Sequence, residues 1–194
     1  MRRINLALCV ALALVITPAG VGLAQSPPKP PQPPFSPAWQ AVLGEWVGVG
    51  SGQPGSGEGT FAFRLELDDR IIVRKNHNDI AATPSQPATA HDDLMVIYPT
   101  ERTAEWRALY ADNEGHVIYY RVRWSADGKK LTFQSDINTG QPRYRLTYTV
   151  ASADEVVIGF EIAPPGRPDA FTSYLTGKAR RNKQSGLGAT TERK

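Results

Sequence analysis

Hydrophobic and polar residues alternate one by one along most of the chain that follows residue 44. The alternation is clearest in segments 61–67, 118–124 and 144–150, where aromatic and branched apolar residues take every second position. A period of two predicts β-strands with one apolar and one polar face. We expect about ten strands, near residues 45–52, 58–68, 70–77, 91–99, 103–111, 116–125, 129–136, 142–150, 155–163 and 170–178.

Turn-forming residues separate these strands at intervals of roughly ten residues, the spacing that consecutive hairpins require. Examples are Asp112-Asn113-Glu114-Gly115 and Asn138-Thr139-Gly140. A sheet of this length with one apolar face buries that face and loses its exposed edges when it closes on itself. The sequence therefore predicts an all-β fold: an antiparallel up-and-down barrel of about ten strands.

A short helix is predicted just before the first strand. Ser36 is a suitable cap, Pro37 fits the first helical position and Gly44 follows the end, which gives a helix of about two turns. Trp46 and Gly48 come next, so the largest side chain stands among the smallest. We expect Trp46 to plug the narrow end of the barrel, while the glycines let the first strand bend sharply.

The first residues have the order of a secretory signal. Arg2 and Arg3 precede an apolar run that ends in small residues at Ala24, after which we expect cleavage. Pro18 interrupts the run before it reaches the roughly 20 apolar residues of a membrane span, so no transmembrane segment is expected in the mature chain. The protein should then be periplasmic or secreted, after cleavage near Ala24.

Four regions follow from these signals. We expect a signal peptide over 1–24, a proline-rich linker over 25–35, the barrel domain over 36–178, and a disordered basic tail over 179–194.

Cysteine and charge exclude several kinds of protein. The single cysteine, Cys9, lies in the expected signal, so the mature chain has no disulfide, no cysteine nucleophile and no cysteine metal ligand. Residues 25–177 carry 14 basic against 18 acidic side chains. They lack the clustered basic face that phosphate backbones require, so nucleic acid is not expected as a partner.

Residues 43–50, LGEWVGVG, resemble the opening strand of calycin-type barrels, in which G-x-W begins the first strand after a short helix. The longer G-x-W-x-G-x-G form looks most like nitrobindin-type barrels and related uncharacterised bacterial exported barrels. The resemblance covers residues 36–178. It implies a small apolar ligand inside the barrel, and lipocalins also pack an arginine from beyond the last strand over the tryptophan. Arg180 or Arg181 is expected to do so here.

The resemblance to nitrobindins does not imply a cofactor for this chain. Nitrobindins hold heme through a histidine late in the chain, whereas the last histidine here, His116, lies in mid-chain. We therefore expect no cofactor.

The first hypothesis for function is an exported, lipocalin-like and non-catalytic barrel that binds a small apolar or amphipathic ligand in its interior. Its ligand-binding residues would be the inward aromatics: Trp46, Phe61, Phe63, Tyr120, Trp124, Phe133, Tyr144, Tyr148, Phe160 and Phe171. The same residues would also line a fully packed core, and the oligomeric state is not predicted. The alternatives are an envelope protein-interaction module with a packed core and a barrel-mouth enzyme that uses the mid-chain histidines.

Metal chemistry has a weak basis in the sequence. His77 precedes a proline-rich loop, and His91 and Asp93 follow it, so these three residues are the candidates for a zinc site. The alternative, which we favour, is solvated loop ends that cap turns. Neither a serine nucleophile motif nor a suitably spaced pair of acids is present, so no catalytic residue is expected.

The strand arginines are expected on the outer face, in cross-strand ion pairs with glutamates such as Glu45, Glu66 and Glu161. They are Arg64, Arg74, Arg107, Arg121, Arg123, Arg143 and Arg145. The alternative is an arginine in the barrel interior at one end, beside Tyr119 or Tyr148, where it would receive a ligand carboxylate.

Export can be tested by mass. Protein purified from its own cells should begin at Gln25, because signal peptidase cuts after the small residue Ala24. Intact-mass spectrometry with sequencing of the N-terminal peptide measures this directly. A chain that keeps residues 1–24 would contradict the expected export.

Overall fold

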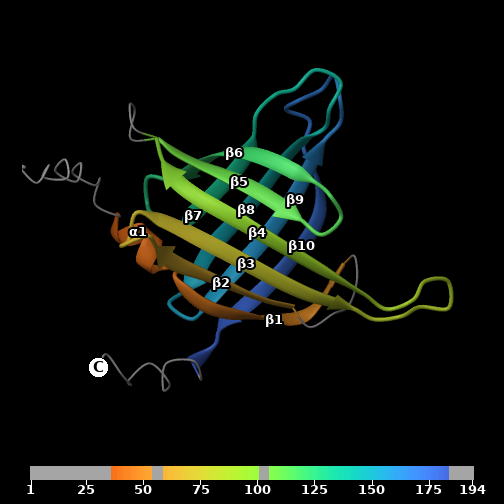
Figure 1. Ribbon diagram of the computed structural model, residues 1–194, viewed down its shortest axis with the longest axis horizontal. Coiled ribbons are helices and arrows are strands. Elements are labelled where there is room, and N and C mark those ends of the chain that lie inside the picture. The colour runs from red at the N-terminus through yellow and green to blue at the C-terminus, as the bar shows by residue number, and fades with distance from the viewer. Residues whose placement is uncertain (1–35, 54–58, 101–104, 184–194) are drawn as a thin grey trace, which may run out of the picture. The chain divides into compact units, whose positions relative to one another are not determined.

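The computed structural model describes residues 36–53, 59–100 and 105–183, which form one closed antiparallel barrel (Figure 1). The expected all-β barrel of ten strands is confirmed. One helix precedes the strands. The elements are α1 (Pro37–Gln40), β1 (Gly44–Gln53), β2 (Gly59–Glu66), β3 (Ile71–Ile80), β4 (Thr89–Pro99), β5 (Trp106–Asp112), β6 (Val117–Trp124), β7 (Lys130–Ser135), β8 (Arg143–Ser152), β9 (Glu155–Ala163) and β10 (Thr172–Arg181).

The connectivity is up-and-down, and every strand pairs with its neighbours in the sequence. The last strand, β10, closes the barrel by pairing with the first, β1. As a result one end of the barrel, which we name the closed end, holds α1 and the turns at 67–70, 125–129 and 153–154. The opposite, open end holds the connections at 81–88, 113–116, 136–142 and 164–171. No helix of the described residues is long and apolar enough to cross a membrane.

The apolar face of the sheet points inward, as the alternation predicts. Phe61 and Phe63 of β2 are buried, and so are Leu146 and Tyr148 of β8 on the other side of the barrel. The ring of Phe63 meets that of Tyr148 edge-on at 5.3 Å between centroids. Large side chains thus meet across the barrel axis and fill its closed half.

The helix is shorter than expected, with four residues in place of about two turns. The amides of Val42 and Leu43 both bond to the carbonyl of Trp39, so the chain tightens after one turn. Burial of Trp39 explains the tight turn, since its ring packs against Trp106 at 5.1 Å and Trp124 at 5.6 Å between centroids. Gly44 then adopts a φ of 104°, which favours glycine, and leads into β1.

Trp46 plugs the closed end, and Arg181 covers it. The indole of Trp46 donates to the carbonyl of Val42 at 2.9 Å. The guanidinium carbon of Arg181 lies 4.4 Å from the centroid of the Trp46 ring. Arg181 also donates to the carbonyls of Leu43 at 2.5 Å and Ala41 at 3.0 Å. The expected arginine over the tryptophan is therefore confirmed for Arg181, whereas Arg180 is exposed beside Glu155.

This contact corrects the predicted end of the barrel. β10 continues to Arg181, beyond the expected boundary at 178, because Ala179 is buried and Arg181 is held by the closed end. The predicted signal and linker, over 1–35, and the tail from 184 on lie outside the described residues.

Replacement of Arg181 should weaken the barrel. We expect Arg181→Ala to lower the free energy of unfolding by about 2 kcal/mol, because it removes charged hydrogen bonds to backbone carbonyls and a cation–π contact. Trp46 fluorescence should shift as the indole loses its cover. Urea unfolding followed by fluorescence measures both effects.

Arg180→Ala is the matched control, one residue away on the exposed face, and it should change stability by less than about 0.5 kcal/mol. If both substitutions lowered the free energy of unfolding equally, the contacts of Arg181 would not be what stabilises the closed end.

Candidate functional site

The open half of the barrel is not filled. A cavity of about 540 Å³ lies there, reached from the open end. Small residues leave the room: among the described residues, a Cβ at Gly177 of β10 would meet no atom within 4 Å. Gly48 of β1 approaches the backbone of Gly59 so closely that a Cβ would lie 3.3 Å from its carbonyl oxygen. The expected interior is therefore partly a packed core and partly a cavity.

Two walls of different chemistry enclose this cavity. Strands β6, β8, β9 and β10 supply an apolar wall, made of Ile118, Tyr144, Leu146, Ile158, Phe160, Ile162 and Leu175. Strands β3, β4 and β5, with the turn after β5, supply a polar wall, made of Arg74, Asn76, Asn78, His91, Asp93, Tyr110, Asp112, Glu114 and His116. A molecule in this cavity would meet both.

A buried ion pair between Arg74 and Asp93 forms the bottom of the polar wall. The two side chains are only 7% and 4% exposed. Arg74 lies over the rings of Phe61 and Tyr148, at 5.7 Å and 5.8 Å from their centroids. Burial is the largest influence on the pKa of Arg74 and would lower it, but the charge of Asp93 together with the nearby tyrosines raises that pKa overall. The guanidinium of Arg74 therefore remains charged inside the barrel.

Two polar atoms beside this pair are unsatisfied. Nε of Arg74 and the hydroxyl of Tyr148 are buried and have no hydrogen-bond partner among the described residues. Such groups cost free energy unless something binds them. Arg74 lines the cavity, but its Nε is itself buried and has almost no accessible surface.

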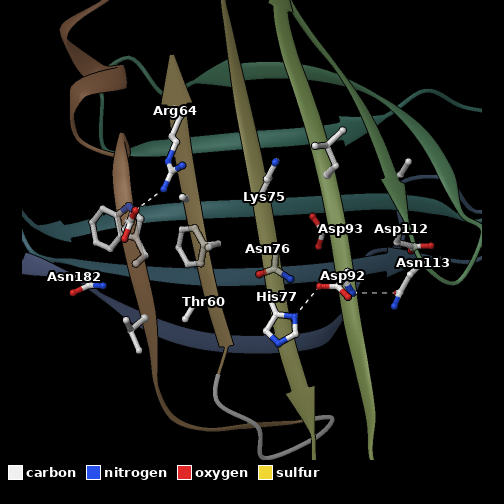
Figure 2. Close-up of a pocket in the computed structure, with 17 residues that line it drawn as sticks. Thr60, Arg64, Lys75, Asn76, His77, Asp92, Asp93, Asp112, Asn113 and Asn182 are labelled. Carbon is white, nitrogen blue, oxygen red and sulfur yellow. Dashed lines mark hydrogen bonds and ion pairs between the residues drawn. The ribbon is translucent and has the colours of Figure 1, made fainter. Parts of the chain in front are cut away.

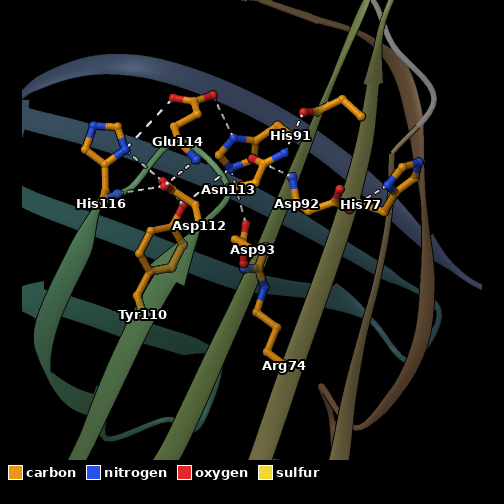
Figure 3. A network of polar contacts seen from close by, with 11 residues as sticks. Arg74, His77, His91, Asp92, Asp93, Tyr110, Asp112, Asn113, Glu114 and His116 are labelled. Atoms are coloured by element: carbon orange, nitrogen blue, oxygen red, sulfur yellow. Dashed lines mark hydrogen bonds and ion pairs between the residues drawn. The ribbon is translucent and has the colours of Figure 1, made fainter.

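His91 joins the ion pair to the mouth of the cavity (Figure 3). Its Nε2 lies 3.5 Å from Oδ2 of Asp93, and its Nδ1 lies 3.0 Å from Oε1 of Glu114. The hydrogen bond to Asp93, followed by the one to Glu114, raises the pKa of His91 from 6.5 to about 9. With no other ligand, His91 is therefore protonated at neutral pH and held between two carboxylates.

Asp112 organises the turn that follows β5. Its Oδ1 accepts the backbone amides of Glu114 at 3.1 Å and His116 at 2.9 Å, and its Oδ2 accepts the hydroxyl of Tyr110 at 3.0 Å. Burial opposes ionisation of this carboxyl, but the bonds from His116 and Tyr110 lower its pKa. Burial also raises the pKa of Tyr110, which stays neutral as a donor.

Three of these side chains are spaced as metal ligands. One ligand atom each from His91, Asp112 and Glu114 lie within 4.8 Å of one another. His116 adjoins them, because its Nδ1 lies 2.9 Å from Oδ2 of Asp112 and 3.9 Å from Oε2 of Glu114.

The three predicted metal candidates do not come together. His91 and Asp93 face the interior of the barrel. His77 lies on the outside, where its Nδ1 bonds to Asp92 at 2.7 Å beside a groove of about 690 Å³ (Figure 2). The register explains this separation, because His77 pairs with Asp92 whereas Asn78 pairs with His91, and neighbouring positions point to opposite faces.

The predicted ligand-binding aromatics fall into three groups. Phe61, Tyr120, Tyr144 and Phe160 line the cavity. Five others are core residues away from the cavity: Trp46, Phe63, Phe133 and Tyr148 are fully buried, and Trp124 packs on Trp39 at the closed end. Phe171 lies outside the barrel, where the guanidinium of Arg145 stacks on its ring at 4.0 Å.

The arginine prediction is right for Arg64 and Arg145, which pair with Glu45 and Glu161. The outer-face prediction is wrong for Arg74, which points inward and lies 5.8 Å from the ring centroid of Tyr148, as the alternative of an interior arginine had it. The alternation carried the signal, since Arg74 is in phase with the buried Ile72. The prediction placed Arg74 outside because arginine is charged, although its position in the alternation pointed inward.

No protein-family model matches the chain, and no curated protein is similar enough to match it.

The buried pair makes a prediction about stability. Asp93→Asn should lower the free energy of unfolding by about 3 kcal/mol, because it leaves the charge of Arg74 buried without its partner. The double variant Arg74→Met/Asp93→Leu should recover most of that loss, since neither charge remains. Urea unfolding at neutral pH measures all three proteins.

Asp92→Asn is the control, on the next residue and on the outer face, with an expected change below about 0.5 kcal/mol. A loss for Asp92→Asn as large as for Asp93→Asn would contradict the account.

Proposed function

We propose that the protein binds a small amphipathic molecule inside the open half of its barrel. The observation that carries this proposal is the unfilled cavity of about 540 Å³ with one apolar and one polar wall. Ligand sites of small molecules have volumes of about 300–1,000 Å³ and combine an apolar lining with a few placed polar groups. The size and the lining of this cavity agree with both.

The polar wall favours a particular kind of head group. Arg74 is already neutralised by Asp93, and His91 by its two carboxylates, so the wall has little net positive charge for an anion. A neutral head group, with a hydroxyl, ester or ketone oxygen, adds no new charge beside Asp93. The apolar part of the ligand would lie along β8, β9 and β10.

We also propose that the barrel is of calycin type and works after export. The G-x-W at Gly44–Trp46, the helix before it and the cover of Trp46 by Arg181 support the first point. The order of residues 1–24 supports the second. The binding proposal stands without either.

Filling the cavity should abolish binding. Gly177→Phe places a ring in the cavity where a Cβ meets no atom, at a glycine whose φ is not in the left-handed region, so the strand accepts it without strain. We expect the affinity for a fluorescent alkyl-ester probe to fall at least tenfold. Fluorescence titration measures this, and native mass spectrometry of protein from its own cells shows whether a molecule is retained.

Thr176→Phe is the matched control, because it adds the same ring one residue earlier on the exposed face. It should leave the affinity unchanged. Wild-type protein that is empty on purification and shows no saturable uptake of the ester, fatty-acid or aromatic probes would end the proposal.

A further inference from the structure

Four polar side chains at the mouth of the cavity come from only two places in the chain. His91 stands near the beginning of β4, while Asp112, Glu114 and His116 belong to the end of β5 and the turn after it (Figure 3). They line the cavity beside the proposed ligand and contain two of the three histidines of the protein. Imidazole and carboxylate together are the donor set of borderline divalent metals such as zinc.

We propose that His91, Asp112 and Glu114 bind one divalent transition-metal ion of the zinc type, with His116 as a further ligand at the rim. This site is independent of the proposed amphipathic ligand, and neither requires the other.

The spacing of the donor atoms supports the site. Ligands around an ion with bonds of 2.0–2.1 Å stand about 2.9 Å apart in an octahedral arrangement and about 3.4 Å apart in a tetrahedral one. The observed separations are 3.0 Å from His91 Nδ1 to Glu114 Oε1, 2.9 Å from His116 Nδ1 to Asp112 Oδ2, and 3.9 Å from His116 Nδ1 to Glu114 Oε2. One ligand atom each from His91, Asp112 and Glu114 lie within 4.8 Å of one another, close enough to share one ion.

The residues behind the ligands give a second reason. A metal-binding histidine usually donates its other ring nitrogen to a carboxylate, which fixes the orientation of the ring. Nε2 of His91 lies 3.5 Å from Oδ2 of Asp93 and 3.3 Å from the hydroxyl of Tyr110, so Nδ1 is the nitrogen left to face Glu114. Asp93 is in turn fixed by Arg74. The residues that orient His91 are buried. Exposed side chains that met by chance would have no such buried partners behind them.

Asp112 is supported in the same way. Its Oδ1 is occupied by two backbone amides, and Tyr110 donates to its Oδ2. Both interactions hold the carboxylate with Oδ2 at 2.9 Å from Nδ1 of His116. The charges also balance, since the carboxylates of Asp112 and Glu114 match a divalent ion and Asp93 is already neutralised by Arg74.

Calorimetry with Zn²⁺ on the full chain, after treatment with a chelator, tests the proposal. We expect one saturable site, and Co²⁺ as a substitute should give visible absorption bands of an ion with nitrogen and oxygen ligands. Glu114→Gln and His91→Gln should each weaken Zn²⁺ binding at least tenfold. Glu114 is exposed, so its replacement leaves the fold intact and decides the matter if His91→Gln proves unstable.

His77→Gln is the matched control. His77 also lies beside two carboxylates, 2.7 Å from Asp92 and 3.3 Å from Asp79, but on the outer face and without a buried support. Its replacement should leave Zn²⁺ binding unchanged. The proposal is overturned if the wild type takes up no Zn²⁺ saturably, if Glu114→Gln binds as the wild type does, or if His77→Gln weakens binding as much as His91→Gln.

Discussion

The ion pair of Arg74 and Asp93 decides how the interior of this barrel is divided. Two charges removed from water are costly unless each has the other and further contacts, and here the aromatic rings of Phe61 and Tyr148 flank the arginine. Toward the closed end, aromatic and aliphatic side chains are buried and packed in one cluster. Toward the open end the polar wall begins at this pair and continues through His91 to the mouth. The pair is thus the floor of the cavity and the base of the network above it.

The choice of side chains on β10 and β1 explains why the open half stays empty. In the closed half, Trp46 of β1 faces the interior, and Arg181 of β10 lies against it. In the open half, the same two strands present Gly177 and Gly48 to the cavity. A barrel of ten strands has a fixed circumference, so the size of the inward residues determines where it is solid and where it is hollow. Small inward residues in the open half and large ones in the closed half leave a pocket at one end without any change in the sheet.

Much of the fold could be predicted from the sequence because the alternation within each strand indicates which of its residues face the interior. The alternation of Phe61, Phe63 and the corresponding residues of other strands indicates that a segment is a strand and also which of its faces is apolar. The helix was overestimated, since Pro37 and Gly44 mark its limits without revealing that burial of Trp39 tightens the turn after Gln40. Phe171 was misplaced for a related reason: it lies in the connection before β10, where a period of two no longer tells inside from outside.

The site was harder to predict than the fold. Asp112, Glu114 and His116 are close in the sequence, but they meet His91 only through the register of β4 against β5. No local pattern gives that register in advance. Arg74 and Asp93 were in phase with buried neighbours, and phase would have placed them inside. Because charged residues are seldom buried, their residue type favoured the outer face, although both are inside.

The seam between β1 and β10 has a consequence for how the protein is made. Leu43 and Arg181, which meet there, are 138 residues apart in the chain. Pairings over such distances form slowly, because the entropy of closing the loop must be lost before the contact is gained. The circle of strands cannot be completed until the ribosome has delivered the last of them. A growing chain therefore cannot close the barrel before β10 is complete.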